Sequence, residues 1–255
     1  FDPAIEILEI LRDSLSAFDP QNTRFCIGLR QDYVSSRFWT FPFSDRNKIL
    51  KLLPNELEDE LPFSPESAIY DFKTIRHLNS SVQILALAAP KHRIDSALNV
   101  FSAAGINPAL LSTEVLALAN CFENWMVTPS EPQEASTSEK HLSLNIYIGH
   151  SRTQILVFEN NRLVNIRTLL WGTKNIAEAI ARRYELPFVE ALKEMKTKAF
   201  ILLNKESAAY DQIVFSETIS GQIKDLIQDL KITLLELNST FNATVKNISI
   251  SGGGS

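Results

Sequence analysis

LSLNIYIGHSRTQILVFENNRLVNIRTLLWGTKNIAEAIARRY, residues 142–184, is the stretch that decides the fold of this chain. In its first part apolar and polar residues alternate, which is the period of a β-strand. The Asn160-Asn161 pair suits a hairpin turn, because Asn tolerates the positive φ that such turns need. The stretch therefore predicts a sheet meander followed by a helix, with strands at residues 142–148, 153–158 and 162–170 and the helix at residues 175–184.

The loops between these elements should meet at one end of the predicted sheet. Gly149 ends the first strand and permits close backbone approach, Thr153 opens the second strand with a hydroxyl, and Gly172 precedes the helix. Loop amides and a helix N-terminus gather at such an end, and both can hold a phosphate. The alternative is an ordinary hairpin turn, since one glycine spacing is a weak signal. The first strand also ends in Tyr147, where a phosphate site usually has an acid.

A further strand, predicted at residues 245–250, runs into three consecutive glycines. Bare backbone of this kind lets the flat ring of a ligand lie against it. A Gly-Gly-Gly-Ser end is also typical of an engineered linker, which is the alternative. The tentative nucleotide-binding residues are therefore Gly149, Thr153, Gly172, Gly252, Gly253 and Gly254.

Composition narrows the functional class. The chain has 255 residues, 45% of them hydrophobic, which suits one large or two ordinary domains. A net charge of −5 without a basic tract argues against a nucleic-acid partner. Cys26 and Cys121 show no pairing pattern, which favours a reducing compartment.

No apolar run reaches the ~18 residues of a membrane span. The start at Phe1 and the glycine-rich end indicate a fragment of a longer protein.

No catalytic or metal-ligating residue is predicted. The acidic residues at positions 56–60 suit a solvated helix face. Arg152 and Lys174 flank the glycine turns and could meet a phosphate, although surface positions are the ordinary expectation for them. The sequence has neither a Gly-x-Ser-x-Gly elbow nor a Gly-x-x-x-x-Gly-Lys-Ser/Thr loop. No two of the four histidines have the short spacing of zinc ligands, such as His-x-x-x-His; they are His77, His92, His141 and His150.

The remaining elements are predicted from periodicity and from helix-end signals. Pro54 is expected to break or kink its helix, residues 73–81 to form a polar loop, and Gly105 to end a helix at the C′ position. Residues 127–140 contain Pro, Ser, Glu and Thr and should form a flexible linker between domains. Helices are predicted at residues 2–18, 45–61, 90–104, 187–198 and 217–240, strands at 24–29, 34–41, 68–72 and 82–88, and a strand followed by a helix within 108–125.

Five stretches together resemble one known family, the actin-like cytoplasmic domains of the type IV pilus assembly protein PilM and its type II secretion relative GspL. Residues 37–43 resemble the family's strand that ends in a Leu-Pro-like turn, and residues 52–63 resemble its acidic helix before Pro-Phe. The others are the helix and glycine within residues 94–118, the second phosphate hairpin with its helix pair in residues 144–196, and the adenosine turn at residues 252–254.

The resemblance implies an α/β protein with the actin-like, or ribonuclease H-like, two-lobed fold. Residues 1–126 would form a first lobe that is truncated at its N-terminus. A small α/β subdomain would be inserted in it around residues 45–110. Residues 127–140 would be the linker, and residues 141–255 would form the second lobe.

Departures from the family motifs bear on function. Members usually have Asp-x-Gly in the second hairpin, where this chain has Tyr147-Ile148-Gly149, and many have Gly-Gly where it has Trp171-Gly172. These two large side chains would crowd a phosphate, and the carboxylate that positions a metal is missing. The family's first phosphate hairpin, which normally precedes a helix like residues 2–18, is not in this sequence.

The resemblance therefore implies a non-catalytic scaffold on the cytoplasmic side of the bacterial inner membrane. It would couple the assembly ATPase of a type II secretion or type IV pilus machine to bitopic inner-membrane platform subunits. No cofactor is expected, or at most weakly bound ATP and Mg²⁺, and a homodimer is left open. The alternative is an ATP-binding actin-like protein of the PilM kind, or another nucleotide-binding enzyme of this fold.

Overall fold

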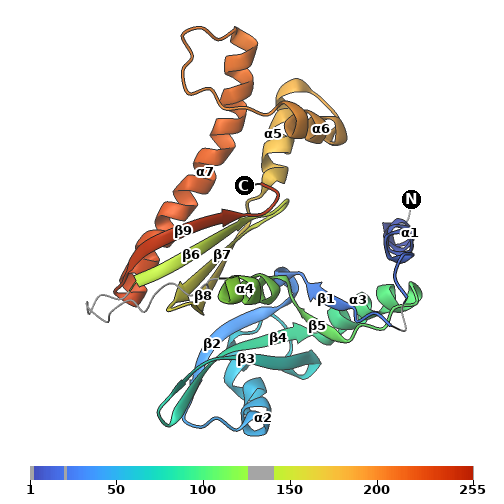
Figure 1. The fold of residues 1–255 in the computed structure, drawn as a ribbon, viewed down its shortest axis with the longest axis vertical. Helices are drawn as coiled ribbons and strands as arrows, with labels where there is room; N and C mark the ends of the chain where they lie inside the picture. Colours follow the sequence, from blue (N-terminus) through green and yellow to red (C-terminus); the bar gives the residue numbers. More distant parts are fainter. Residues whose placement is uncertain (1–2, 20–21, 126–140, 255) are drawn as a thin grey trace. The chain divides into compact units, whose positions relative to one another are not determined.

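The computed structural model describes residues 3–19, 22–125 and 141–254 of the chain. It forms two compact units, Phe1–Asn124 and Trp125–Ser255. Figure 1 shows the first in blue to green and the second in yellow to red. The linker predicted at residues 127–140 lies outside the described residues. No helix in the described parts is both long and apolar enough to cross a membrane.

The first unit contains two small sheets. Strands β1 and β5 pair in parallel, and strands β2, β4 and β3 form an antiparallel sheet in that order. Its helices and strands are α1 (Pro3–Leu15), β1 (Cys26–Leu29), β2 (Ser35–Phe41), α2 (Arg46–Leu57), β3 (Ala68–Leu78), β4 (Ser81–Pro90), α3 (Lys91–Ala103), β5 (Leu110–Thr113) and α4 (Glu114–Trp125), with 3-10 turns η1 (Gln31–Tyr33), η2 (Glu58–Glu60) and η3 (Pro65–Ser67).

Two local predictions for this unit were wrong. Residues 73–81 are not a polar loop, because β3 continues to Leu78 and turns into β4 through Asn79, which has φ 42°. Some polar side chains of this stretch bind other parts of the unit, since the Lys73 ammonium lies 2.7 Å from the Asn120 amide oxygen and Arg76 Nε donates to Gln83 Oε1 at 2.7 Å. Pro54 does not break α2, which runs unbroken to Leu57. Leu53 and Leu57 are buried against the β2–β4–β3 sheet, and this burial outweighs the hydrogen bond that proline cannot make.

The end of α3 follows its sequence signal. Gly105 adopts φ 80°, and its N–H donates to Ser102 O, while Ile106 N–H donates to Phe101 O. These two bonds form a Schellman motif, which satisfies carbonyls at the helix end. The glycine is therefore required by its left-handed backbone.

The second unit is a four-stranded sheet covered by helices. Its strand order is β8-β7-β6-β9, in which β7 is antiparallel to both β8 and β6, and β9 is parallel to β6. The predicted Asn turn is present, since Asn160 and Asn161 have φ 50° and 60°. The elements are β6 (His141–Ile148), β7 (Thr153–Glu159), β8 (Arg162–Leu169), α5 (Thr173–Tyr184), α6 (Phe188–Lys198), α7 (Tyr210–Phe241) and β9 (Thr244–Ser251).

Helix α7 begins seven residues before the predicted start at Glu217. The Gln212 side chain accepts a hydrogen bond from Ala209 N–H at 3.1 Å, which satisfies a backbone donor at the new N-terminus. Phe215 and the buried Ser216 continue the packed face into this added part. The helix packs its stripe on α5 and on the β6–β7 face, where the core of the unit lies.

Candidate functional site

The sheet topology brings all six tentative nucleotide-binding residues to one edge. Strands β6, β8 and β9 run in the same direction and end there, and β7 begins there. We call this end the glycine edge, defined by the turns at residues 149–152, 171–173 and 252–254. The predicted convergence of loops is therefore present, and three segments far apart in sequence meet.

Helix α5 begins at the glycine edge, and its free amides are already used. The first four N–H groups of a helix have no partner within it, which is why such ends attract anions. Here Thr173 N–H donates to Gly149 O at 3.1 Å and Lys174 N–H to His150 O at 2.7 Å. Gly172 N–H donates to the Asn175 side chain at 3.0 Å, and Asn175 N–H to Gly172 O at 3.0 Å. All four donors thus bind the chain's own oxygens.

The glycines at this edge make room mainly for neighbouring backbone. A Cβ placed on Gly172 would lie 2.6 Å from the His150 carbonyl carbon and 2.7 Å from Arg152 N. Gly252 has φ 100° and faces the Ile148 carbonyl. A Cβ on Gly254 would meet Thr173 and Ile148 side chains at 2.5 and 2.6 Å, whereas one on Gly253 would meet nothing within 4 Å. Only Gly253 of these leaves bare, uncovered backbone.

Thr153 and Trp171 belong to the core and not to the rim of the edge. Thr153 is completely buried, and its hydroxyl donates to Trp171 O at 2.9 Å. The Trp171 indole is buried in the core, and its Nε1 donates to Gln222 O of α7 at 3.0 Å. The expectation that Trp171 would crowd a phosphate was wrong, because its ring packs inward on α7. That Thr153 contacts a nucleotide stays a prediction.

A buried polar ladder lies just behind the glycine edge, and the sequence did not indicate it. The amide of Asn145, which has no exposed surface, donates to Ser249 Oγ at 3.0 Å. Ser251 Oγ donates to Asn145 Oδ1 at 3.3 Å. These contacts tie β6 to β9. The alternation of polar residues in both strands was visible, but nothing in the sequence placed the two strands side by side.

Other side chains around the edge are engaged as well. The Tyr147 ring lies beside Gly149, 3.5 Å from where a Cβ would be. His150 makes an edge contact with Phe188 of α6 at 6.4 Å between ring centroids. Lys174 pairs with Glu178 at 3.1 Å. Within residues 3–19, 22–125 and 141–254, no three His, Cys, Asp or Glu side chains gather as metal ligands.

These contacts decide how well a nucleotide fits the edge. A phosphate would have to displace backbone hydrogen bonds at α5, and no carboxylate stands at position 147 to hold its metal. A phosphate at the N-terminus of α5 would therefore have to replace hydrogen bonds that the chain makes to its own oxygens. The uncovered backbone of Gly253 could still lie against a ring.

The first unit holds an apolar groove of about 370 Å³, which we call the β3–β5 groove. Among the described residues β3 pairs only with β4, and β5 only with β1, so each has an unpaired edge. Burial raises the pKa of Tyr70, whose neutral hydroxyl donates to Pro65 O at 3.0 Å. The apolar lining comes from Leu29, Ile69, Phe72, Leu87, Leu110 and Leu116. Such a groove suits an extended apolar segment that adds to a strand edge.

A meander ending in glycine turns, followed by a helix pair and a parallel strand, defines an actin-like α/β protein. The family model of the type IV pilus assembly protein PilM matches residues 7–255, and the chain belongs to this family. The resemblance seen in the sequence is thereby confirmed. No curated protein sequence matches the chain at a significant level.

One solved structure supports the fold, and two others are similar over part of the chain. The alignment with a PilM-PilN type IV pilus biogenesis complex covers 99% of this chain and 69% of the other chain, with a TM-score of 0.76 and 20% sequence identity. The alignment with the cytoplasmic domain of EpsL covers 86% of this chain and 80% of the other, with 12% sequence identity and a TM-score of 0.43. EpsL is an inner-membrane component of the type II secretion system of Vibrio cholerae. An archaeal actin homologue in complex with ADP matches 59% and 47% at 16% identity, with a TM-score of 0.41. The last two scores are too low to support an argument.

Proposed function

We propose that this protein is a non-catalytic scaffold of a type IV pilus or type II secretion platform on the cytoplasmic side of the bacterial inner membrane. The observation that carries the proposal is the state of the α5 N-terminus. Each of the first four N–H groups of this helix end donates to an oxygen of the chain itself. The donors that would hold phosphates therefore already have acceptors within the protein. The carboxylate expected for metal-dependent hydrolysis is replaced by Tyr147.

The β3–β5 groove supplies the binding side of this proposal. Its apolar lining and two unpaired strand edges suit a short tail that binds as an added strand. One solved structure with this fold is a complex of PilM with PilN. The partner that we propose is therefore the cytoplasmic tail of a bitopic inner-membrane platform subunit. The assembly ATPase would bind elsewhere on the scaffold, which would couple the two.

The alternative, an ATP-binding actin-like protein, is favoured by two observations. The glycine turns do meet at one edge, and Gly253 leaves bare backbone there. Under this alternative the α5 amides would exchange their carbonyl partners for phosphate oxygens when ATP binds. Gly149, Gly172 and Gly252–Gly254 would line the nucleotide.

The test is a calorimetric titration of the full-length protein with ATP and Mg²⁺. The scaffold predicts no binding heat and no rise in melting temperature at millimolar ATP, where a genuine site would stabilise the fold by mass action. Micromolar binding would favour the alternative, and measurable hydrolysis would overturn the scaffold outright. The matching positive test is capture of the secretion or pilus ATPase and of the membrane subunit's tail by the immobilised protein.

A further inference from the structure

The start of helix α3 carries an unusual set of charges. Its first three residues are Lys91, His92 and Arg93, and no acid lies in its first turn. Because the backbone dipoles make a helix N-terminus partly positive, basic side chains are unfavourable there unless an anion lies nearby. The usual side-chain cap is also missing, because the preceding residue is Pro90. This end of α3 therefore lacks the negative partner that a helix start normally has.

The backbone donors of this helix end are open, unlike those of α5. Within the parts of the chain that the structure describes, no oxygen outside α3 accepts a hydrogen bond from the N–H groups of residues 91–93. At α5 the corresponding donors bind Gly149 O, His150 O and the Asn175 side chain. A phosphate binds best where free amides and the positive end of a helix coincide. Of these two helix starts, α3 has the donors available.

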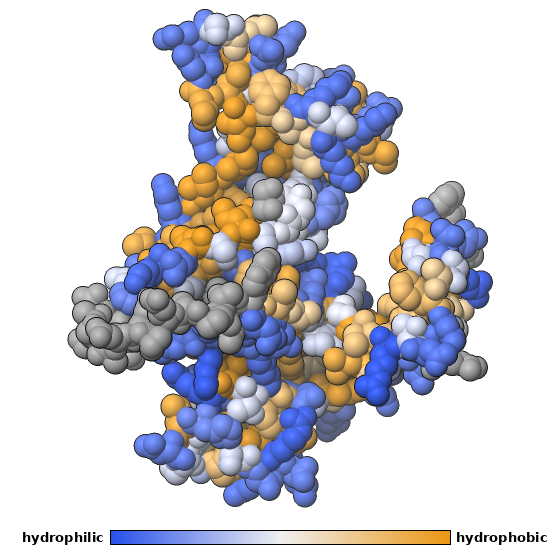
Figure 2. Space-filling view, in the orientation of Figure 1, coloured by the Kyte–Doolittle hydropathy of each residue, from blue (hydrophilic) through white to orange (hydrophobic). Residues whose placement is uncertain are grey.

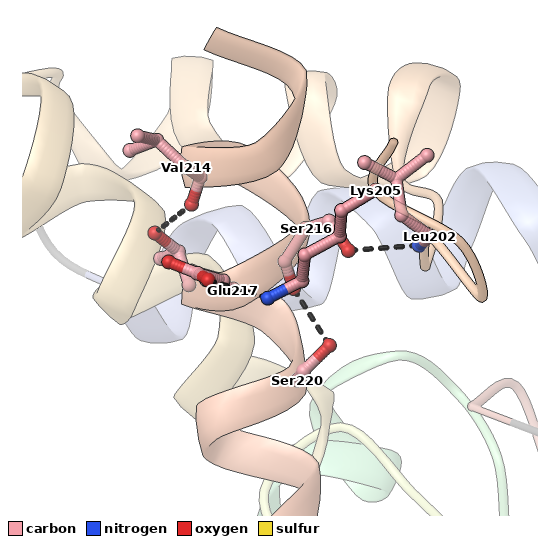
Figure 3. A network of polar contacts seen from close by, with 7 residues as sticks. Leu202, Lys205, Val214, Ser216, Glu217 and Ser220 are labelled. Atoms are coloured by element: carbon pink, nitrogen blue, oxygen red, sulfur yellow. Dashed lines mark hydrogen bonds and ion pairs between the residues drawn. The ribbon is translucent and has the colours of Figure 1, made fainter. Parts of the chain in front are cut away.

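The start of α7 shows the more usual arrangement, in which the groups near a helix end bind one another. There the Lys205 ammonium binds the Glu217 carboxylate at 2.6 Å (Figure 3). Leu202 N–H donates to Ser216 Oγ at 2.8 Å, so the segment before α7 is ordered by its own contacts. A cation at a helix end of this protein can thus have an acid beside it, and the basic residues of α3 differ in this respect.

Arg93 is positioned to bind an anion. Its guanidinium stacks on the ring of Tyr33, 4.7 Å from the ring centroid, and it makes no ion pair with a carboxylate among the described residues. Stacking uses the flat face of a guanidinium and leaves the N–H groups at its edge able to donate. The aromatic ring therefore holds the Arg93 side chain in place without using its donors.

A pocket of about 620 Å³ lies beside this helix start, and we call it the η1–α3 pocket. Small-molecule sites usually have volumes of ~300–1,000 Å³, so this pocket has room for more than a simple ion. Arg37 and Glu60 form an ion pair at 2.6 Å in its wall, which leaves the positive charge at α3 uncompensated. Hydrophobic surface gathers elsewhere, over the upper part of α7 next to α6 (Figure 2). The argument uses six of the lining residues, namely Gln31, Tyr33, Arg37, Glu60, His92 and Arg93.

Gln31 supplies a second and independent sign of a ligand. This side chain lines the pocket and is only 8% exposed. Its Nε2 donates to Val34 O at 3.3 Å and to Ser36 Oγ at 3.2 Å, which fixes the orientation of the amide because a carbonyl can only accept. The buried Oε1 then has no donor among the described residues. Buried acceptors rarely stay unpaired, so an occupant with a hydroxyl or amino group would complete this one.

We propose that the η1–α3 pocket binds a small organic phosphate ester. The phosphate accepts hydrogen bonds from the open N–H groups of α3 and from Arg93, and a hydroxyl or amino group on the rest of the molecule donates to Gln31 Oε1. All the phosphate donors belong to one helix end, which suits a compact tetrahedral anion better than an extended acidic chain. Sugar phosphates and mononucleotides share this chemistry.

This inference is independent of the proposed function. The pocket lies wholly within the first unit and contains none of the residues of the glycine edge. Failure of the ATP or tail-binding experiments would leave it untouched, and its own failure would leave the scaffold proposal standing.

The first experiment is a calorimetric titration of the full-length protein with ribose 5-phosphate and with AMP at pH 8, where the phosphate is a dianion. At least one should bind with a dissociation constant below about 1 mM. Arg93→Gln should raise that constant at least tenfold without changing the urea midpoint. Arg46→Gln is the matched control, because Arg46 also stacks on a ring, 4.8 Å from the Phe72 centroid, and lies outside the pocket. Weaker binding of both ligands, or equal affinity of the two variants, would overturn the proposal.

The choice of ligands separates the two sources of the phosphate. AMP that binds at least tenfold more tightly than ribose 5-phosphate would identify a mononucleotide, and equal affinities would identify a sugar phosphate. Methyl phosphate has the anion without a hydroxyl donor, so it should bind at least tenfold more weakly than ribose 5-phosphate. Equal binding of methyl phosphate would overturn the role of Gln31 and the ligand class with it.

A second experiment locates the anion by the amide chemical shifts of the isotope-labelled full-length protein. Ribose 5-phosphate should shift the N–H signals of residues 91–93 at the start of α3. The N–H signals of residues 173–175 at the start of α5 are the matched control and should stay in place, because those donors already have acceptors. Shifts at α5 in place of α3 would put the phosphate at the glycine edge and contradict the proposal.

Discussion

The glycine edge and the β3–β5 groove differ in whether their backbone groups already have hydrogen-bond partners. At the glycine edge the backbone donors that could take a ligand already bind the chain's own carbonyls. At the groove two strand edges carry backbone groups with no strand partner among the described residues. A glycine-rich turn thus marks close packing here, while the surface that we propose as a binding site has no glycine signature. Sequence motifs and binding capacity are separate properties of this fold.

The largest expected effect is on stability at the glycine edge. Gly172→Ala would drive a Cβ into the backbone at His150 and Arg152, and we expect a loss of about 3 kcal/mol in the free energy of unfolding. Gly221→Ala is the control, because nothing lies within 4 Å of that position in α7. It should raise stability by about 0.5–1 kcal/mol. Urea unfolding measures both, and a tolerated Gly172→Ala would mean that the edge is looser than its contacts indicate.

A smaller effect is expected from the hydroxyl of Thr153. Thr153→Val keeps the shape but removes the donor to Trp171 O, which should cost about 1–2 kcal/mol. Thr197→Val on the exposed side of α6 should stay within about 0.5 kcal/mol. If Thr153 instead serves a nucleotide, the substitution would change ATP affinity more than urea resistance.

The other side of the comparison is tested at the groove. Leu110 lines it and is 56% exposed, so Leu110→Asp should leave the unfolding midpoint nearly unchanged. It should weaken binding of a labelled membrane-subunit tail at least tenfold, about 1.4 kcal/mol, because a charge would enter an apolar site. Leu235→Asp on α7 is the matched exposed control. Fluorescence anisotropy that reports equal affinity for both variants would remove the groove from the proposal.

The smallest effect concerns pH at the segment before α7. The pKa of Glu217 is lowered, first by its hydrogen bond from Lys205 and then by the charge of that lysine. A lowered carboxylate pKa adds stability at neutral pH, which is lost as pH falls through the folded-state value. Glu217→Gln should therefore make the segment less sensitive to acid, whereas the control Glu206→Gln should leave its acid sensitivity unchanged. Hydrogen exchange of the amides near Leu202, measured as a function of pH, reports this sensitivity. Identical pH profiles for both would show that the ion pair contributes nothing.

Local signals predicted much of the second unit. The alternation in β6, the Asn160-Asn161 turn and the glycine before α5 all act between residues close in sequence. They were enough to predict that the loops converge, and family resemblance extended this to the actin-like fold.

Distant partners explain what could not be predicted. Lys73 looked like a loop residue because Asn120 and Glu123, which bind its ammonium, are far along the chain. The inward direction of the Trp171 ring depends on Gln222 of α7. The engagement of the α5 amides depends on the exact path of the Gly149–Arg152 turn. Motif spacing cannot show whether a donor is free.

Helix α7 has a mechanical consequence. It has 32 residues, and at 1.5 Å of rise per residue it is a rod about 48 Å long. One end carries the ordered segment around Leu203, and the other leads through Asn242 into β9, which returns to the glycine edge. Because a packed helix resists bending, α7 holds these two ends of the second unit at a fixed separation of about 48 Å.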